Sequence, residues 1–393
     1  MDKSSIKSKV INNGLVYDIF TGLSERRDLR IEGGLIRSIA SHITPGPGEE
    51  VIDAGGNTIF PGFIDGHSHI GVLFQFPDSN DCNECSNPST QSMRVVDAFR
   101  YDDPCLLENA RAGITTALIT PGSGNAVCGQ AAIIKTYAPR PLDMIVNDYA
   151  AFKLAFGENP KSVYMPLKRL PMSRMGTAGV VSAFFERALR YREKRVAGGE
   201  YNFDYEMALP VLEKKVPLKI HAHRADDILT AIRIAKKYQI PFTLDHCTEG
   251  YLIIDELVKA EAPIFVGPLF MFKTKAELRN ADPYAAIAYE KRGLLVSIAS
   301  DHNITDSRFL PVAAGELVKA GLSHAAAIRM LTINPAKAIG MDEKIGSLTE
   351  GKEADLFIAG GDPLEIRTPI SMTMIGGEIV PRQPELTGGS DAH

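Results

Sequence analysis

The chain has 393 residues, with 43 Lys and Arg against 48 Asp and Glu, and therefore a formal net charge of −5. This balance gives no global reason to expect a nucleic-acid or membrane-surface partner, and because no run of about 18 apolar residues occurs, no membrane span is expected. The stretch MDKSSIKSKVINNG lacks the apolar segment of a signal peptide, and the odd number of cysteines, five, favours a reducing cytoplasm over a disulfide framework.

The first and last parts of the chain are rich in predicted strands. The stretch DLRIEGGLIRSIA has two alternating apolar runs around Gly33 and Gly34, which is typical of a hairpin. A similar sequence pattern recurs near the other end, in ADLFIAGGDPL and SMTMIGGEIV. We therefore expect residues 1–60 and 344–393 to form one small β-rich domain.

Residues 61–343 alternate between predicted strands and helices. Runs such as ITTALITPGSGN, VPLKIHAH, IPFTLDHCTEG and LLVSIASDHN predict buried strands, and ADDILTAIRIAKKY and EGYLIIDELVKAEA predict helices between the later ones. Continuous apolar strands indicate a sheet that is covered on both faces, and polar residues recur at the strand ends, where barrel active sites are built. A (β/α)8 barrel is predicted. A doubly wound sheet is the alternative, but no G-x-G-x-x-G follows the first strand.

Residues 161–195 depart from this rhythm, with nine basic and two acidic side chains. The stretch TAGVVSAFFERALRYREKR predicts a helix. The favoured interpretation is a helical insertion with a solvated face, and a lid or an anion-attracting rim is the alternative.

Ionisable and metal-binding residue types stand at successive predicted strand ends. A barrel would bring these ends onto one face, and His67 and His69, two residues apart in a strand, would point to the same side. Imidazole nitrogens suit Zn, Fe or Ni, and a carboxylate can complete the site and accept a proton. One histidine at a strand end is more often a polar cap, but five strand ends together favour a metal site. The residues are His67, His69, Lys153, His221, His223, His246, Asp301 and His302.

Lys153 allows two interpretations. A lysine at a strand end can react with carbon dioxide and bridge two metal ions as a carbamate. It can equally be an ion-pair partner or a substrate contact. Both alternatives stay open at this point.

The motifs PGFIDGHSHI, LKIHAH, LDHCTEG and IASDHN, with the tail LTINPAKAIGMDEKIGSLTEGKEADLFIAGGDPL, resemble the amidohydrolase superfamily. The texture is similar to that of imidazolonepropionase-like and prolidase-like members, and the resemblance extends from about Val10 to Val380. It implies a distorted TIM (β/α)8 barrel over residues 61–343, with a small β-sandwich made from both chain ends.

The resemblance also implies a set of metal ligands. His67 and His69 correspond to the ligands on the first strand, His221 to the ligand on the fifth, and Asp301 to the ligand and general base on the eighth. His246 would bind a second metal ion or hold the catalytic water. One or two divalent ions are implied, zinc first, with Fe, Mn or Ni as alternatives.

Four residues are candidate substrate contacts. His223 and His302 have no assured role in the family, and Asn125 lies in the loop GSGN, which leaves the second strand. Arg224 stands shortly after His221, where imidazolonepropionase-like enzymes have an acidic residue, so this particular subgroup is disfavoured. The segment TPGSGNAVCGQAAIIK resembles a subgroup whose substrates are not defined.

Together these implications predict hydrolysis of a C–N bond in a cyclic amide, a dipeptide or a related small molecule. The metal would activate a water, Asp301 would accept its proton and pass it to the leaving nitrogen, and the metal and His246 would stabilise the oxyanion. Deamination of an aminated heterocycle is the alternative. A catalytically inactive scaffold barrel is a third interpretation, which the presence of all five histidine and aspartate ligands disfavours. The expected partner is a small-molecule substrate, and a homo-oligomer is left open.

Overall fold

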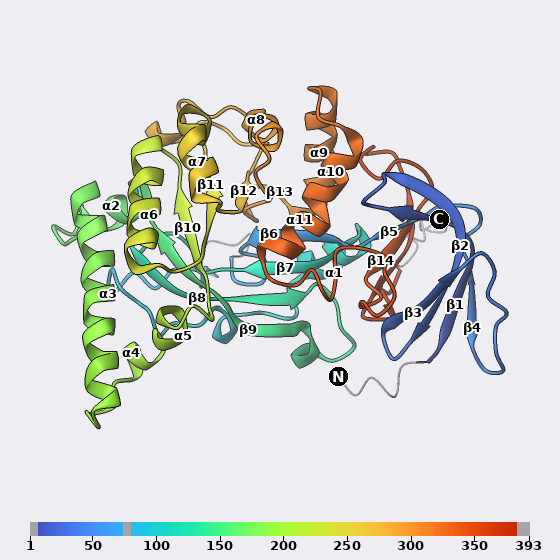
Figure 1. Cartoon of the computed structure of the whole chain (residues 1–393), viewed down its shortest axis with the longest axis horizontal. Coiled ribbons are helices and arrows are strands. Elements are labelled where there is room, and N and C mark those ends of the chain that lie inside the picture. Colours follow the sequence, from blue (N-terminus) through green and yellow to red (C-terminus); the bar gives the residue numbers. More distant parts are fainter. Residues whose placement is uncertain (1–6, 74–79, 383–393) are drawn as a thin grey trace, which may run out of the picture.

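Two sheets of eight strands each organise the chain (Figure 1). This computed structural model describes residues 7–73 and 80–382. In this part of the chain, no helix combines the length and apolarity needed to cross a membrane.

One sheet combines strands from both chain ends, in the order β16-β15-β14-β5-β1-β2-β3, with β4 beside β1. Gly33 and Gly34, with φ of 56° and 79°, form the predicted hairpin turn between β2 and β3, a turn that needs positive φ at both positions. Antiparallel pairing of β14 with β5 joins the two ends of the chain. The description of this part as a β-sandwich, and its boundaries, stay predictions. The strands are β1 (Lys9–Asp18), β2 (Leu23–Glu32), β3 (Leu35–Ala40), β4 (Glu50–Asp53), β5 (Thr58–Pro61), β14 (Leu356–Ala359), β15 (Ile370–Ile375) and β16 (Glu378–Ile379).

The other sheet is a nearly closed barrel in the order β13-β12-β11-β10-β9-β8-β7-β6. Its two end strands approach each other where the backbone N–H of Asp301, after β13, donates to the carbonyl of His67, in β6. The predicted α/β barrel is confirmed in this form. Its strands are β6 (Phe63–Ser68), β7 (Ile114–Ile119), β8 (Val127–Lys135), β9 (Ile145–Ala155), β10 (Leu218–Ala222), β11 (Phe242–His246), β12 (Ile264–Val266) and β13 (Val296–Ile298).

Strand β8 breaks the expected strand–helix alternation. It runs antiparallel to both β7 and β9, whereas the other neighbouring strands of the barrel run parallel. The physical reason is the length of the connections, residues 120–126 and 136–144. An antiparallel neighbour needs only a short turn, but a parallel one needs a crossover of about a dozen residues or more.

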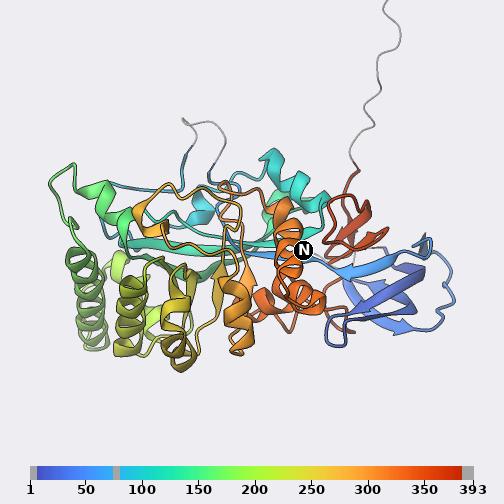
Figure 2. The same ribbon diagram turned by 90° about the horizontal axis from the view of Figure 1, so that it is seen from above.

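The helices pack their apolar faces on the barrel. In α6, the buried residues Ile228, Ala231, Ile232 and Ala235 recur at the spacing of one helical face. Figure 2 shows the helices from α3 (green) to the orange ones in a row along one side of the barrel sheet, with the blue strands of the other sheet at one end. The helices are α1 (Pro104–Arg111), α2 (Glu158–Tyr164), α3 (Arg174–Val196), α4 (Phe203–Glu206), α5 (Leu209–Leu212), α6 (Ala225–Tyr238), α7 (Ile254–Ala260), α8 (Ala285–Lys291), α9 (Leu310–Lys319), α10 (His324–Leu331) and α11 (Ile333–Ala338).

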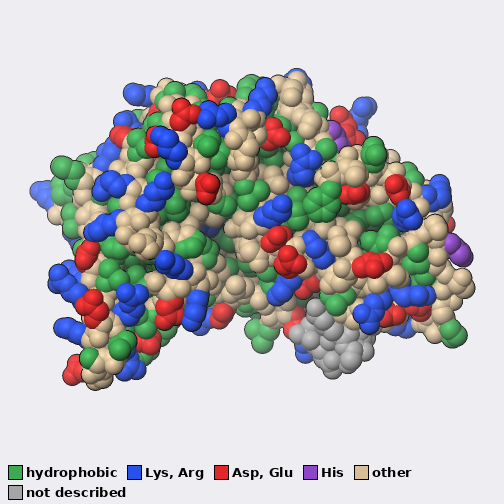
Figure 3. All heavy atoms as spheres, viewed as in Figure 1, with side chains coloured by type: hydrophobic (Ala, Val, Ile, Leu, Met, Phe, Trp, Pro, Cys, Tyr) green, Lys and Arg blue, Asp and Glu red, His purple; other side chains and the backbone are tan. Residues whose placement is uncertain are grey.

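The basic region of residues 161–195 lies mainly in α2 and α3. Helix α3 buries Val180, Val181, Phe184 and Phe185, and most of its basic side chains, such as Arg187, Arg190 and Lys194, are exposed. Arg174 is an exception, because it pairs with the buried Asp227 of α6. Figure 3 shows Lys and Arg side chains (blue) over the side of the molecule where Figure 1 places α3. This arrangement is that of a packed helix with a solvated face.

Candidate active site

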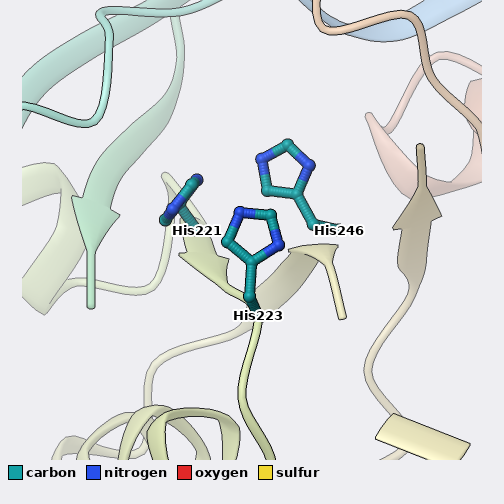
Figure 4. Close-up of side chains that lie close together, drawn as sticks. All are labelled: His221, His223 and His246. Carbon is teal, nitrogen blue, oxygen red and sulfur yellow. The ribbon is translucent and has the colours of Figure 1, made fainter. Parts of the chain in front are cut away.

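The predicted ligands meet at the carboxyl ends of the barrel strands. His67 lies in β6, His221 in β10, and His246 is the last residue of β11. The ring of His246 is central, with centroid distances of 5.0 Å to His67, 4.7 Å to His221 and 4.6 Å to His223. Figure 4 shows the rings of His221, His223 and His246 close together at the ends of their strands.

Their donor atoms form two overlapping groups. Atoms of His221, His223 and His246 lie within 4.8 Å of one another, and so do atoms of His67, His246 and Asp301. The Nε2 atoms of His67 and His69 both lie 3.2 Å from Oδ1 of Asp301. His246 belongs to both groups, so the geometry offers donors for one ion or for two neighbouring ions.

Hydrogen bonds at Nδ1 set the orientation of three of these rings. Nδ1 of His69 donates to the carbonyl of Thr120 (2.7 Å), and Nδ1 of His246 to the carbonyl of Gly267 (2.6 Å). Nδ1 of His223 lies 2.7 Å from the hydroxyl of Thr248. A ring that donates from Nδ1 keeps the lone pair of Nε2 for a metal ion, as metal-binding histidines commonly do. Nε2 of His246 is buried without a hydrogen-bond partner among the described residues.

The protonation states also suit a cation. Burial, with the repulsion of the neighbouring His246, lowers the pKa of His221 and His223 well below the usual range, and burial lowers the pKa of His246 to about 4. Burial alone would raise the pKa of Asp301, but His246 and the facing rings of His67 and His69 hold that pKa well below its usual value. Neutral imidazoles around an ionised carboxylate are a donor set that fits a divalent metal ion.

A buried ion-pair cluster lies behind His67. Asp245, fully buried, contacts Nζ of Lys219 at 2.6 Å and Nζ of Lys153 at 2.7 Å. Its carboxylate also lies 3.0 Å from Nδ1 of His67, in a contact too oblique for a regular hydrogen bond. Burial alone would raise the pKa of Asp245, but His67, Lys153 and Lys219 hold it well below its usual value. Lys153, one of the predicted site residues, is thus an ion-pair partner of Asp245 in this structure.

Two of these residues, Asp245 and Lys219, were absent from the sequence-based prediction. A signal for both existed. Lys219 stands two residues before His221 and therefore shares its side of β10, and Asp245 pairs in register with His221 across the sheet. A charged residue inside an otherwise apolar strand points to a buried partner.

Backbone conformation at two ligand positions is unusual. His246 and Asp301 have φ of 67° and 51°, in the left-handed region that non-glycine residues seldom adopt. Such positions cluster at functional sites, where the surrounding structure holds them. Gly66, beside His67, has a different constraint, because an added Cβ would lie 2.0 Å from the ring of Phe265.

A cavity of about 400 Å³ opens beside the clustered histidines and Asp301. Its wall includes His69, His221, His223 and Asp301, so the cavity gives access to the donor atoms. One part of the wall is apolar and another carries amide, hydroxyl and ammonium groups. The further lining residues are Leu73, Cys82, Asn83, Gly122, Ser123, Asn159, Pro268, Phe270, Met271, Phe272, Thr274, Lys275, Leu278 and Ile304.

Three predicted substrate contacts do not line this cavity. Arg224 forms an ion pair with Asp226, two residues away at the start of α6. His302 is buried, with Nδ1 3.9 Å from Asp306. The fourth predicted contact, His223, lies in the cavity wall.

Asn125 is the third of these, and its side chain holds loops together. Its amide NH2 donates to the carbonyl of Glu84 and to the hydroxyl of Thr90, and its carbonyl accepts from Tyr164. The amide group of Asn125 is therefore engaged in hydrogen bonds within the protein. The loop GSGN still reaches the cavity, through Gly122 and Ser123.

Comparison with known proteins identifies the family. The family model described as "Amidohydrolase family" matches residues 211–380. A solved structure of an amidohydrolase from Thermotoga maritima MSB8 is 36% identical and superposes with a TM-score of 0.91, covering 95% of this chain and 100% of that one. The chain belongs to the amidohydrolase family. The expectation of a metal-dependent hydrolase that acts on C–N bonds is therefore confirmed at the level of the family.

Curated relatives of this amidohydrolase are more distant. The amidohydrolase tasK of Hapsidospora irregularis is 26% identical over 377 residues, which cover 86% of this chain. An adenine deaminase of Bacillus velezensis is 25% identical over 392 residues, which cover 94% of this chain. The chain spans only 38% of the first protein and 57% of the second.

Proposed function

We propose that the protein hydrolyses a C–N bond in a small amide, such as a cyclic amide or a dipeptide, with a divalent metal ion held at the strand ends. The observation that carries this proposal is the convergence of Nε2 atoms on the carboxylate of Asp301. His67 and His69 both face that carboxylate, and His246 lies beside it with an Nε2 that has no hydrogen-bond partner in the described part of the chain.

The proposed ligands are His67, His69, His221, His246 and Asp301. A bound divalent ion would polarise the substrate carbonyl and make water a better nucleophile at neutral pH. Asp301 is ionised and lines the cavity, so it can accept a proton from the attacking water and return it to the leaving nitrogen. Hydrogen bonds at Nδ1 hold the rings of His69 and His246 in the tautomer that this arrangement needs.

We propose that Lys153 acts as an ammonium group in the ion-pair cluster. Its Nζ lies 2.7 Å from the carboxylate of Asp245. A carbamate in the same place would bring two anions into contact in a buried layer, at a large cost in free energy. On this proposal the metal ligands are histidine and aspartate alone, with zinc the first choice for such a set.

Deamination of an aminated heterocycle is the second candidate function. The specific support is the similarity to an adenine deaminase, which extends over 94% of this chain. Hydrolysis of an amide and deamination both use an activated water and a proton shuttle, so the same residues would serve either reaction. The released product separates them, because deamination of a heterocyclic amine yields ammonia, whereas hydrolysis of a cyclic amide or a peptide bond yields none.

The test combines elemental analysis with a substrate screen. Protein purified without chelators is analysed for zinc, iron, manganese and nickel, and then assayed with hydantoins, lactams, dipeptides and nucleobases. We expect at least one equivalent of a transition metal and release of a new amine or carboxylate from one amide class. Protein that stays free of metal after incubation with each ion would contradict the proposal, and ammonia release from nucleobases alone would favour the deaminase.

A further inference from the structure

The loop between β12 and α8 places a lysine in the wall of the active-site cavity. Nζ of Lys275 donates to Oδ1 of Asn159 at 2.7 Å. Nδ2 of Asn159 in turn lies 2.7 Å from Oγ of Ser123 and 3.4 Å from Nε2 of His221. Only one side chain therefore separates this ammonium group from a proposed metal ligand.

Apart from Lys275, the charged group in the cavity wall belongs to the proposed metal centre. Among the described residues that line the cavity, Lys275 is the one Lys or Arg, and Asp301 is the one Asp or Glu. Asp301 is a proposed ligand, so its charge is directed at the metal ion. A substrate in this cavity meets an ammonium group on the side of Asn159.

Another part of the cavity wall is apolar and open. Phe272, Ile304 and Phe270 expose 88%, 58% and 45% of their surface, and all three line the cavity. Large apolar side chains that are grouped and exposed at a cavity favour a ligand with an apolar part. Met271 and Leu278 extend this wall.

We propose that Lys275 is the anion subsite of this cavity, and that it selects amide substrates which carry a carboxylate beside an apolar side chain, as N-acyl amino acids and dipeptides do. The inference rests on the proposed hydrolysis of a C–N bond and names its substrate class. The scissile amide would lie at the metal centre, the carboxylate at Lys275, and the apolar group against Phe270 and Met271.

A purely structural role for Lys275 is the competing explanation. Nζ lies 3.5 Å from Oε1 of Glu277, a fully buried carboxylate whose other oxygen accepts from the backbone N–H of Glu158. However, the side chain of Lys275 is 37% exposed, while that of Glu277 is not exposed at all. An ammonium group has three donors, so contacts to Asn159 and Glu277 leave one for a ligand.

The experiment compares matched acids and amides. N-acetyl derivatives of leucine, methionine and phenylalanine, and their primary carboxamides, are titrated into the zinc-loaded full chain by calorimetry. The variants are Lys275→Gln, which removes the charge, and Lys275→Arg, which keeps it. Lys273→Gln is the matched control, because Lys273 lies in the same loop and donates to the carbonyl of Arg279 instead.

We expect the wild-type protein and Lys273→Gln to bind at least one acid more tightly than its amide, by about 10- to 100-fold, the range for a charged hydrogen bond. Lys275→Gln should lose this preference while binding the amide unchanged, and Lys275→Arg should recover part of it. Equal binding of acid and amide, an unchanged preference in Lys275→Gln, or no binding of any acid would overturn the proposal. A lower melting temperature of Lys275→Gln with an unchanged preference would assign the lysine to Glu277 alone.

Turnover of the same compounds is measured separately, as release of acetate, the product that the acids and the carboxamides have in common. If the acids bind as expected but are not cleaved, and the wider amide screen is also negative, the proposed hydrolysis fails while the anion subsite stands. If amides without a carboxylate are cleaved equally well, the hydrolysis stands and the subsite fails.

Discussion

Replacement of Asp245 by Asn tests the ion-pair cluster behind the proposed metal centre. The substitution keeps the shape of the side chain and removes its charge. Lys153 and Lys219 are 0% and 1% exposed, and both ammonium groups contact this carboxylate, at 2.7 Å and 2.6 Å. In Asp245→Asn, two buried ammonium groups would therefore lose their shared counter-ion.

The expected loss is large. Removal of one partner from a buried ion pair destabilises proteins by about 3–5 kcal/mol, because the remaining charge stays buried without compensation. His67 would also lose its contact with the carboxylate, 3.0 Å from its Nδ1. Outer partners of metal-binding histidines are worth about 10–100-fold in metal affinity, and because this contact is not a regular hydrogen bond, zinc should bind more weakly by about the lower of these factors.

Urea unfolding followed by circular dichroism measures the stability, and competition with a fluorescent chelator measures the zinc affinity. The matched control is Asp148→Asn, which also removes a carboxylate from a barrel strand, β9, but breaks a surface pair, with Arg94 at 2.6 Å and Asp148 60% exposed. A surface pair contributes about 0–1 kcal/mol, so the control should unfold nearly as the wild type does. Equal stability of Asp245→Asn and Asp148→Asn, with unchanged zinc affinity, would refute this account of the cluster.

Three further predictions concern the same site. Asp301→Asn should lower turnover by about 10²–10⁴-fold, the usual contribution of general acid–base catalysis, with an unchanged circular dichroism spectrum; near-normal turnover would exclude Asp301 as the base. Lys153→Met should keep the metal content of the wild type by elemental analysis, whereas loss of one of two ions would reveal a carbamate bridge. Gly66→Ala should lower stability by about 1–3 kcal/mol in urea unfolding, because the new methyl group overlaps the ring of Phe265; an unchanged midpoint would show that this ring can move at no cost.

The barrel could be predicted because its strands are continuous apolar runs that end in polar residues. Two strands show this form. Strand β10 closes with His221 and Ala222, and β11 closes with His246. The reversed direction of β8 was not predicted. Its sequence, VCGQAAIIK, is as apolar as that of a parallel strand and fully buried, so only the short connections on either side carry the signal.

The clustering of the histidines that we propose as metal ligands could be predicted for the same reason as the barrel. Parallel strands bring their carboxyl ends to one face, so a histidine at the end of each strand is enough to place them together. His67, His246 and Asp301 meet as this rule expects. The substrate side follows no such rule, and Arg224 shows why: its position after β10 suggested the cavity, but Asp226 lies within its reach along the chain and pairs with it.

The proposed substrate recognition depends instead on contacts between connections of the barrel, which no sequence pattern marks. Lys275 and Asn159 are 116 residues apart and lie in different connections of the barrel, yet a hydrogen bond of 2.7 Å joins them. Neither residue ends a strand or belongs to a motif, so no periodicity marks the pair. The strand ends of this fold can supply the chemistry in any member with the same ligands, while the packing of α2 against the loop between β12 and α8 decides which charge the substrate must carry. A change of substrate therefore needs new residues at positions such as 159 and 275, and it can leave every proposed metal ligand in place.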